Sequence, residues 1–201
     1  SRSPSLPTHL YVFTLMVMSL AIDHASLLVR GVHSYEAWHL PPPVYADWPS
    51  FWTRFVTHMC APGFFFLMGA GLTLRGTRRE DRLRVMLRGL LLILLEQLLV
   101  DPVLYGTMRW TEFGVLSTLG AAMVVGALLV SLRPGVLAAV GVALVLLCQL
   151  PPRMATGQVS LPPWAHLLFL PGGTGNWFVL YPLLPWLGVV LLGMAFGFTA
   201  G

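Results

Sequence analysis

Long runs of apolar residues, separated by short polar or proline-rich stretches, dominate the pattern of this chain. Each run approaches the roughly 20 residues that an α-helix needs to cross a bilayer. The pattern therefore predicts an all-α fold, a polytopic membrane helix bundle of about six transmembrane helices in a single domain over residues 1–201. We place the helices near 9–31, 50–74, 84–105, 112–132, 134–151 and 178–199.

The connections between these runs are of two kinds. Only Arg133-Pro134-Gly135 separates the fourth run from the fifth, which predicts that these two helices are antiparallel neighbours. The segments 32–49 and 152–177 are irregular and rich in Trp, His and Pro. Such loops are long for a small bundle, and we expect them to fold over its mouth.

Composition supports a membrane protein. Of 201 residues, 56% are hydrophobic and 10% are charged, whereas about a quarter of a typical soluble domain is charged. The cysteines, Cys60 and Cys148, both lie in apolar runs and offer neither a disulfide framework nor a metal-binding spacing, so we expect two small buried side chains. The chain starts without Met and stops in an apolar run, which we interpret as trimming or as part of a longer protein.

Arginine sets the predicted orientation. All 12 basic residues are Arg, and half of them lie between residues 75 and 88. Cytoplasmic loops of membrane proteins carry such an excess, so we place this loop and the N-terminus in the cytoplasm. The segments 32–49, 105–111 and 152–177 then lie on the outer side.

His58 stands out because it lies in an apolar run that also holds Arg54 and Pro62. Ionisable groups in a bilayer cost roughly 2.5–3.5 kcal/mol each, so each is a functional hypothesis. Pro62 lacks the N–H that would bond to the carbonyl of His58, four residues earlier, and this predicts a kink at that histidine.

Further polar residues share the predicted depth of His58. In the outer leaflet we expect Asp23 and His24 of the first helix, Arg54 of the second, and Glu96 and Asp101 of the third. A carboxylate beside a histidine fixes its tautomer and stabilises the imidazolium, which is the usual arrangement for general-base catalysis. The alternative is a structural polar network that ties the three helices together. Arg54 is then a counter-charge for a carboxylate or a substrate contact.

The arginine-rich loop also permits two interpretations. Its guanidinium groups can bind the phosphates of a cofactor, or they form an ordinary cytoplasmic loop that contacts lipid headgroups. The sequence shows no pattern for a metal and no nucleic-acid signature. The loop residues that we consider for cofactor binding are Arg75, Arg78, Arg79 and Arg88.

Motifs along the chain resemble a known family. Thr57 to Gly69 reads T-H-M-C-A-P-G-F-F-F-L-M-G and is similar to a "T-H-x-C-A-P-x-F-F-F-L-x-G" stretch of bacterial membrane proteins like heparan-α-glucosaminide N-acetyltransferase. Agreement extends, in order and spacing, to Ile22-Asp23-His24, Arg88–Glu96 and Tyr181–Gly188. The resemblance covers nearly the whole chain. Leu10 and Phe13-Thr14 depart from the acidic residue and Arg-Gly that usually open the first helix.

The resemblance implies an activity. Members of this family move an acetyl group from cytosolic acetyl-CoA to an amino sugar across the membrane, with a catalytic histidine on the far side. It implies a catalytic role for His58 or His24, and acetyl-CoA bound beside the arginine-rich loop. From the carboxylate–histidine chemistry above, we expect Asp23 and Glu96 to take part in catalysis. We expect substrate binding by Arg54, Asp101, His166 and Trp186.

The sequence also leads to expectations about the location and partners of the protein and about two alternative functions. We expect a bacterial inner-membrane protein that contacts lipids and a sugar or glycan acceptor; a homo-oligomer is left open. One alternative is a proton-coupled transporter in which Asp23, His58 and Glu96 relay protons. Another is a non-catalytic membrane subunit, which the changed residues at Phe13-Thr14 favour.

Overall fold

The structure of the protein is a computed structural model. It describes residues 14, 17, 18, 21, 48–74, 78–105, 111–148, 162–174 and 177–200. These residues fall into two compact units that divide between Phe64 and Phe65, and each is described by itself. They are mostly helical, as predicted. Among them, no helix combines the length and the apolar character needed to cross a membrane. That residues 1–201 form one domain stays a prediction.

The first unit contains a break where the sequence predicted a kink. Helix α2 covers Trp48–His58, Met59 forms a turn, and helix α3 starts at Cys60 and continues to Leu74 in the second unit. Pro62 cannot donate the hydrogen bond that would continue the helix past His58. The run 50–74, expected as one helix, is therefore two.

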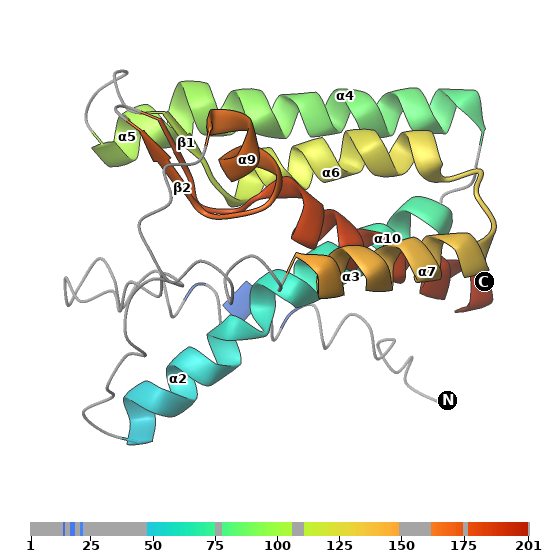
Figure 1. Ribbon diagram of the computed structural model, residues 1–201, viewed down its shortest axis with the longest axis horizontal. Helices are drawn as coiled ribbons and strands as arrows, with labels where there is room; N and C mark the ends of the chain where they lie inside the picture. The colour runs from blue at the N-terminus through green and yellow to red at the C-terminus, as the bar shows by residue number, and fades with distance from the viewer. Residues whose placement is uncertain are drawn as a thin grey trace, which may run out of the picture. The chain divides into compact units, whose positions relative to one another are not determined.

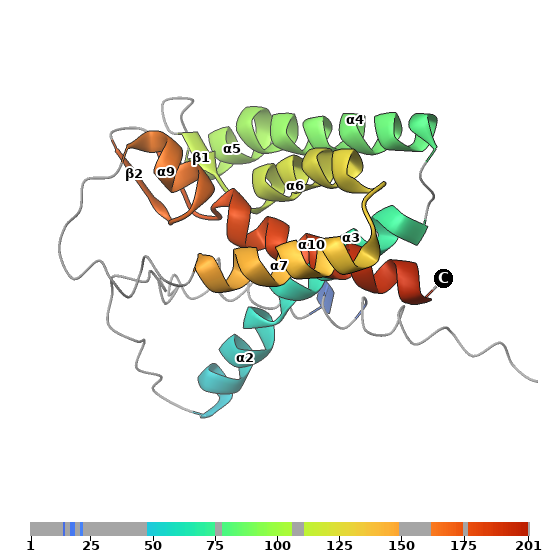
Figure 2. The ribbon, with the colours of Figure 1, turned by 45° about the vertical axis from the view of Figure 1, so that its right-hand side comes forward.

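The second unit is a helical layer with a small sheet at one end (Figures 1 and 2). After α3, this unit contains a nearly continuous rod that consists of α4, a π-helical turn η1 and α5. The elements that the structure describes after α3 are α4 Arg79–Leu95, η1 Glu96–Val100, α5 Asp101–Tyr105, β1 Thr111–Phe113, α6 Val115–Leu129, α7 Pro134–Leu147, α9 Pro163–Leu168, β2 Gly172–Thr174, β3 Trp177–Val179 and α10 Leu183–Ala200.

The sheet was not predicted. Its strand order is β1-β3-β2, with β1 parallel and β2 antiparallel to β3. Glu112 pairs with Phe178, so the beginnings of two runs expected to be helical, 112–132 and 178–199, form strands instead. The segment 152–177, expected to be irregular, contains α9 and β2. Gly172 permits the tight path into β2 because its φ of 138° lies in a region that favours glycine.

Glycines set the closest helix contacts. Gly89 of α4 and Gly120 of α6 face each other so closely that a methyl group on either one would meet the carbonyl oxygen of the other. Gly141 of α7 and Gly188 of α10 form the same reciprocal pair. Small residues that let helix backbones approach in this way are typical of membrane helix packing.

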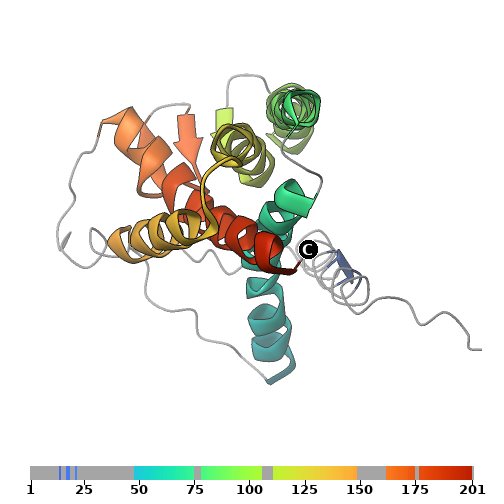
Figure 3. The same cartoon turned by 90° about the vertical axis from the view of Figure 1, so that its right-hand side faces the viewer.

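These pairs decide which helices are neighbours. The main partner of α6 is α4, and that of α7 is α10, although α6 and α7 are joined by the short turn at Arg133 (Figure 3). The prediction that the consecutive helices α6 and α7 pack against each other as neighbours is therefore wrong. Buried side chains of α3, α4, α6, α7 and α10 form one core that includes Phe65, Leu137 and Met194.

Candidate functional site

Glu96 binds the start of a neighbouring helix. Its side chain is buried, and its Oε2 accepts hydrogen bonds from the N–H groups of Gly114 and Ser117, at 3.0 and 2.8 Å. Its Oε1 accepts one from Leu116 at 3.0 Å. The first N–H groups of a helix have no partner within that helix, and Gly114, the N-cap of α6, has no side chain to supply one. Glu96 is therefore the cap of α6, supplied by another helix.

Gly114 leaves room for this carboxylate. A Cβ atom at position 114 would lie 2.8 Å from Oε1 of Glu96 and 3.5 Å from Oε1 of Glu112. Because the φ angle of Gly114 is −94°, its backbone conformation suits any residue. The glycine is thus required by space and not by conformation.

The π-helical turn brings a second carboxylate to the same segment. The N–H of Asp101 bonds to the carbonyl of Glu96, five residues earlier, which places both residues on one face of the rod. Asp101 is buried, and its Oδ2 accepts the N–H of Glu112 at 3.0 Å. Single π turns inside α-helices are frequent at functional sites.

Gln97 completes the arrangement and was missed by sequence reasoning. Its Nε2 donates to the carbonyl of Glu112 at 2.7 Å and to the Oγ of Ser117 at 3.2 Å. Thr118 extends the network by donating to the carbonyl of Tyr181, at the entrance to α10. We call Glu96, Gln97 and Asp101 the carboxylate clamp, since together they hold residues 112–117.

The sequence left two roles open for the carboxylates of the clamp: a part in catalysis or substrate binding, or a structural polar network between helices. Both oxygens of Glu96 accept backbone hydrogen bonds, so to act as a base Glu96 would have to release part of the α6 cap. These contacts support the structural role. The catalytic role of Glu96 and the substrate-binding role of Asp101 stay predictions.

The histidine site lies largely outside the described residues. Asp23 and His24 are among the residues that the structure does not describe, and Arg54 is placed only by its position in α2. His58, the last residue of α2, is exposed. The catalytic roles of both histidines, and a meeting of His58 with a carboxylate, therefore stay predictions.

The two residues expected to bind substrate near the sheet have defined surroundings. The Nδ1 of His166 lies 3.3 Å from the carbonyl oxygen of Leu170, which can only accept, so Nδ1 carries a proton in this contact. In the neutral ring Nε2 is then an acceptor. Trp186 is stacked on Phe65, with ring centroids 4.8 Å apart, and contacts Tyr181 at 5.3 Å.

The arginine-rich segment is exposed at the start of α4. Arg84 pairs with Glu80 and Asp81 at 3.8 and 3.6 Å, and Asp81, Arg84, Val85 and Arg88 line a shallow hollow. Arg78, Arg79 and Arg88 are also exposed, while Arg75 lies outside the described residues. Within the described part of the chain, no group of His, Cys, Asp and Glu could hold a metal ion.

Comparison with known proteins identifies the family. Residues 13–200 match the family model described as heparan-alpha-glucosaminide N-acetyltransferase, catalytic. No curated protein and no solved structure matches the chain. The match begins before α2 and extends to the end of α10, so it covers nearly the whole chain. It confirms the resemblance found from the four motifs. The chain belongs to the heparan-alpha-glucosaminide N-acetyltransferase catalytic family.

Proposed function

We propose that the protein is a membrane-embedded acyltransferase that moves an acetyl group from cytosolic acetyl-CoA to an amino sugar or a similar envelope acceptor at the outer face. The match of residues 13–200 to an acetyltransferase catalytic family is the observation that carries this proposal. The features of the second unit described below support its individual parts.

The surface of the α4–η1–α5 rod supports the membrane location. From Leu83 to Val103, a leucine-rich row of large apolar side chains is exposed. At 1.5 Å per residue this row is about 30 Å long, which equals the thickness of the hydrocarbon core. Charged residues precede the row at the start of α4, and Arg84 and Arg88 lie within its first two turns, at the end that we place next to the cytoplasm. The row comprises Leu83, Leu87, Leu90, Leu91, Leu94, Leu95, Leu98, Leu99 and Val103.

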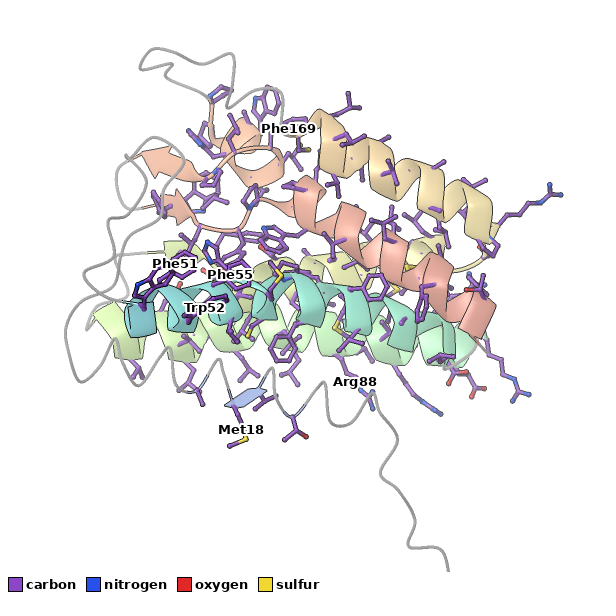
Figure 4. The ribbon with its side chains drawn as sticks, turned by 90° about the horizontal axis from the view of Figure 1, so that it is seen from below. Met18, Phe51, Trp52, Phe55, Arg88 and Phe169 are labelled. Atoms are coloured by element: carbon purple, nitrogen blue, oxygen red, sulfur yellow. The ribbon has the colours of Figure 1, made fainter. Side chains whose placement is uncertain are left out.

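The arginines at the start of α4 support a site for the donor's phosphates. Arg84 is paired with acidic neighbours, whereas Arg88 forms no ion pair among the described residues. Figure 4 shows the side chain of Arg88 extending from the helix. A guanidinium group can bind two oxygens of one phosphate at once. The hollow beside Arg88 is large enough for one phosphate group.

For the acceptor side we propose His166 as a contact and His58 or His24 as the base. In its neutral form, His166 offers Nε2 to a sugar hydroxyl or amine, since Nδ1 is used by Leu170. The base takes a proton from the acceptor amine, the amine nitrogen forms a bond to the acetyl carbon, and the bond from that carbon to sulfur breaks. The proton finally reaches the CoA thiolate.

The direct test uses the whole chain in proteoliposomes with radiolabelled acetyl-CoA and candidate amino sugars. We expect label in the sugar, and a fall of about 100-fold or more in the transfer rate for whichever of His58→Ala and His24→Ala removes the base. His33→Ala is the matched control, because His33 lies outside the four motifs. Transfer that is unchanged by either variant would remove the catalytic assignment.

A binding measurement tests the donor separately. Acetyl-CoA at 100 times its dissociation constant should stabilise the folded protein by about 2.7 kcal/mol. Arg88→Gln should reduce that shift, whereas Glu80→Gln, a change at another exposed position of the same helix, should leave it unchanged. Proton-coupled uptake without any effect of acetyl-CoA would favour a transporter instead.

A further inference from the structure

We propose that helix α2 lies along the lipid–water interface of the membrane, with one ring-lined side in the lipid, and does not cross the bilayer. The proposal rests on the membrane location proposed above. It replaces the expectation that residues 50–74 form one spanning helix.

The apolar side chains of α2 gather on one side. Trp48, Trp52 and Phe55 are exposed by 74%, 54% and 50%, and Val56 and Met59 are exposed as well. Together with Phe51 they occupy one arc of a helix of 3.6 residues per turn. A side of this size, exposed along the whole helix, calls for an apolar environment.

The rings also contact one another, as Figure 4 shows. Phe51 lies with its centroid 6.0 Å from Trp48, 5.5 Å from Trp52 and 6.1 Å from Phe55. Tryptophan is enriched where membrane meets water, because its ring is apolar and its N–H can bond to headgroups and water. An apolar groove of a partner protein would not specifically favour tryptophan at positions 48 and 52, whereas the lipid–water interface does.

The opposite arc of the helix suits the headgroups. Positions 50, 53, 54 and 57 fall there and hold Ser, Thr, Arg and Thr, and His58 ends the helix. The helix contains no acidic residue, so its formal charge complements lipid phosphates. Interfacial helices combine such a polar arc with Trp, Phe and Leu on the other side.

The length of α2 argues against crossing. Its 11 residues extend about 16 Å, roughly half the hydrocarbon thickness, before the chain breaks at Met59. The break permits α2 and α3 to take different directions relative to the membrane. An interfacial helix needs no greater length.

Spin labels test the depth of α2 in the full chain reconstituted in phosphatidylcholine and phosphatidylglycerol vesicles. Single cysteines replace Trp52, Phe55, Met59, Thr53 and Thr57 in a background of Cys60→Ala and Cys148→Ala. A further label replaces Leu94, in the exposed row of α4, as a reference. Relative collision rates with oxygen and with a water-soluble nickel complex report the depth of each label.

We expect labels at 52, 55 and 59 to lie about 5–10 Å below the phosphates, at one common depth, and labels at 53 and 57 to meet the nickel complex. A spanning helix would place residue 59 about 10 Å deeper than residue 52, and that steady increase would overturn the proposal. Labels that all face water would overturn it too. If the Leu94 label also faces water, the membrane location itself fails; a deep Leu94 label confines the failure to α2.

The native tryptophans provide a second measurement that needs no cysteine replacement. Lipids brominated near the headgroup should quench the fluorescence of the unmodified chain, and Trp48→Phe with Trp52→Phe should remove a measurable share of that quenching. Equal quenching in the chain and in this double variant would contradict the interfacial position. Stronger quenching of these two tryptophans by lipids brominated deep in the chain would indicate a spanning helix.

Discussion

Replacement of Glu96 by Gln tests whether the carboxylate clamp holds the start of α6. The change keeps the size of the side chain but turns one acceptor oxygen into an NH2 donor. If the amide oxygen faces Gly114 and Ser117, the NH2 group opposes the N–H of Leu116. The variant thus leaves one partly buried donor without an acceptor and weakens the other bonds by removing their charge.

The expected cost follows from these bonds. A buried N–H left without a partner costs about 1–3 kcal/mol, and a hydrogen bond to a charged group is worth about 1 kcal/mol more than a neutral one. One lost bond and two weakened ones give about 3–5 kcal/mol. For a chain of this size the corresponding fall in melting temperature is about 6–20 °C.

The assay is thermal unfolding of the purified chain in detergent, followed by circular dichroism. Glu80→Gln is the matched control, because Glu80 lies in α4 of the same rod, with its side chain 87% exposed and paired only at the surface. That control should change stability by at most about 0.5 kcal/mol. A Glu96→Gln variant that melts within 2 °C of Glu80→Gln would refute the capping role.

Three glycine substitutions give further predictions, all measured by the same unfolding assay. Gly114→Ala should destabilise by about 1–3 kcal/mol, since its methyl group would lie 2.8 Å from the fixed carboxylate of Glu96; no loss would mean that the carboxylate can move. Gly89→Ala should cost a similar amount, because the methyl group would lie 2.5 Å from the carbonyl oxygen of Gly120. Gly71→Ala, which meets nothing within 4 Å, should be neutral or stabilising, and equal losses at positions 71 and 89 would contradict the packing argument.

The local features of the fold could be predicted from the sequence. The break after His58 follows from Pro62, whose ring and missing N–H act within one helical turn. The rod at 84–105 was predicted from its apolar run, although α4 starts earlier, at Arg79, where charged residues form the first turn. Gly69, Gly89, Gly120 and Gly126 lie at close helix contacts, whereas Gly71 meets nothing within 4 Å.

The features that depend on distant residues could not be predicted. The pairing of Thr111–Phe113 with Trp177–Val179 joins segments that both read as the beginnings of apolar helices. The π turn that aligns Glu96 with Asp101 is followed by Pro102, but a proline in an apolar run indicates an irregular helix and not which kind of irregularity forms. Gln97 carried no signal as a single polar residue, and its role emerges only when the clamp is assembled.

The candidate site was predicted in part for the same reason. A buried carboxylate in an apolar run indicates a partner but does not identify it, and for Glu96 that partner is the backbone of α6. The histidines were marked by their place in an apolar run and by motifs. Which of His24 and His58 serves as the base depends on distances that periodicity does not contain.

The external cap of α6 has a consequence for the order in which the chain forms. Glu96 lies 18 residues before Gly114, so the ribosome releases the cap before the helix that receives it. When α6 emerges, a completed α4 rod can present its carboxylate to the new helix and hold its first turn. A circular permutant that synthesises α6 first would lack this template, and we expect its α6 to form only after α4 has been made.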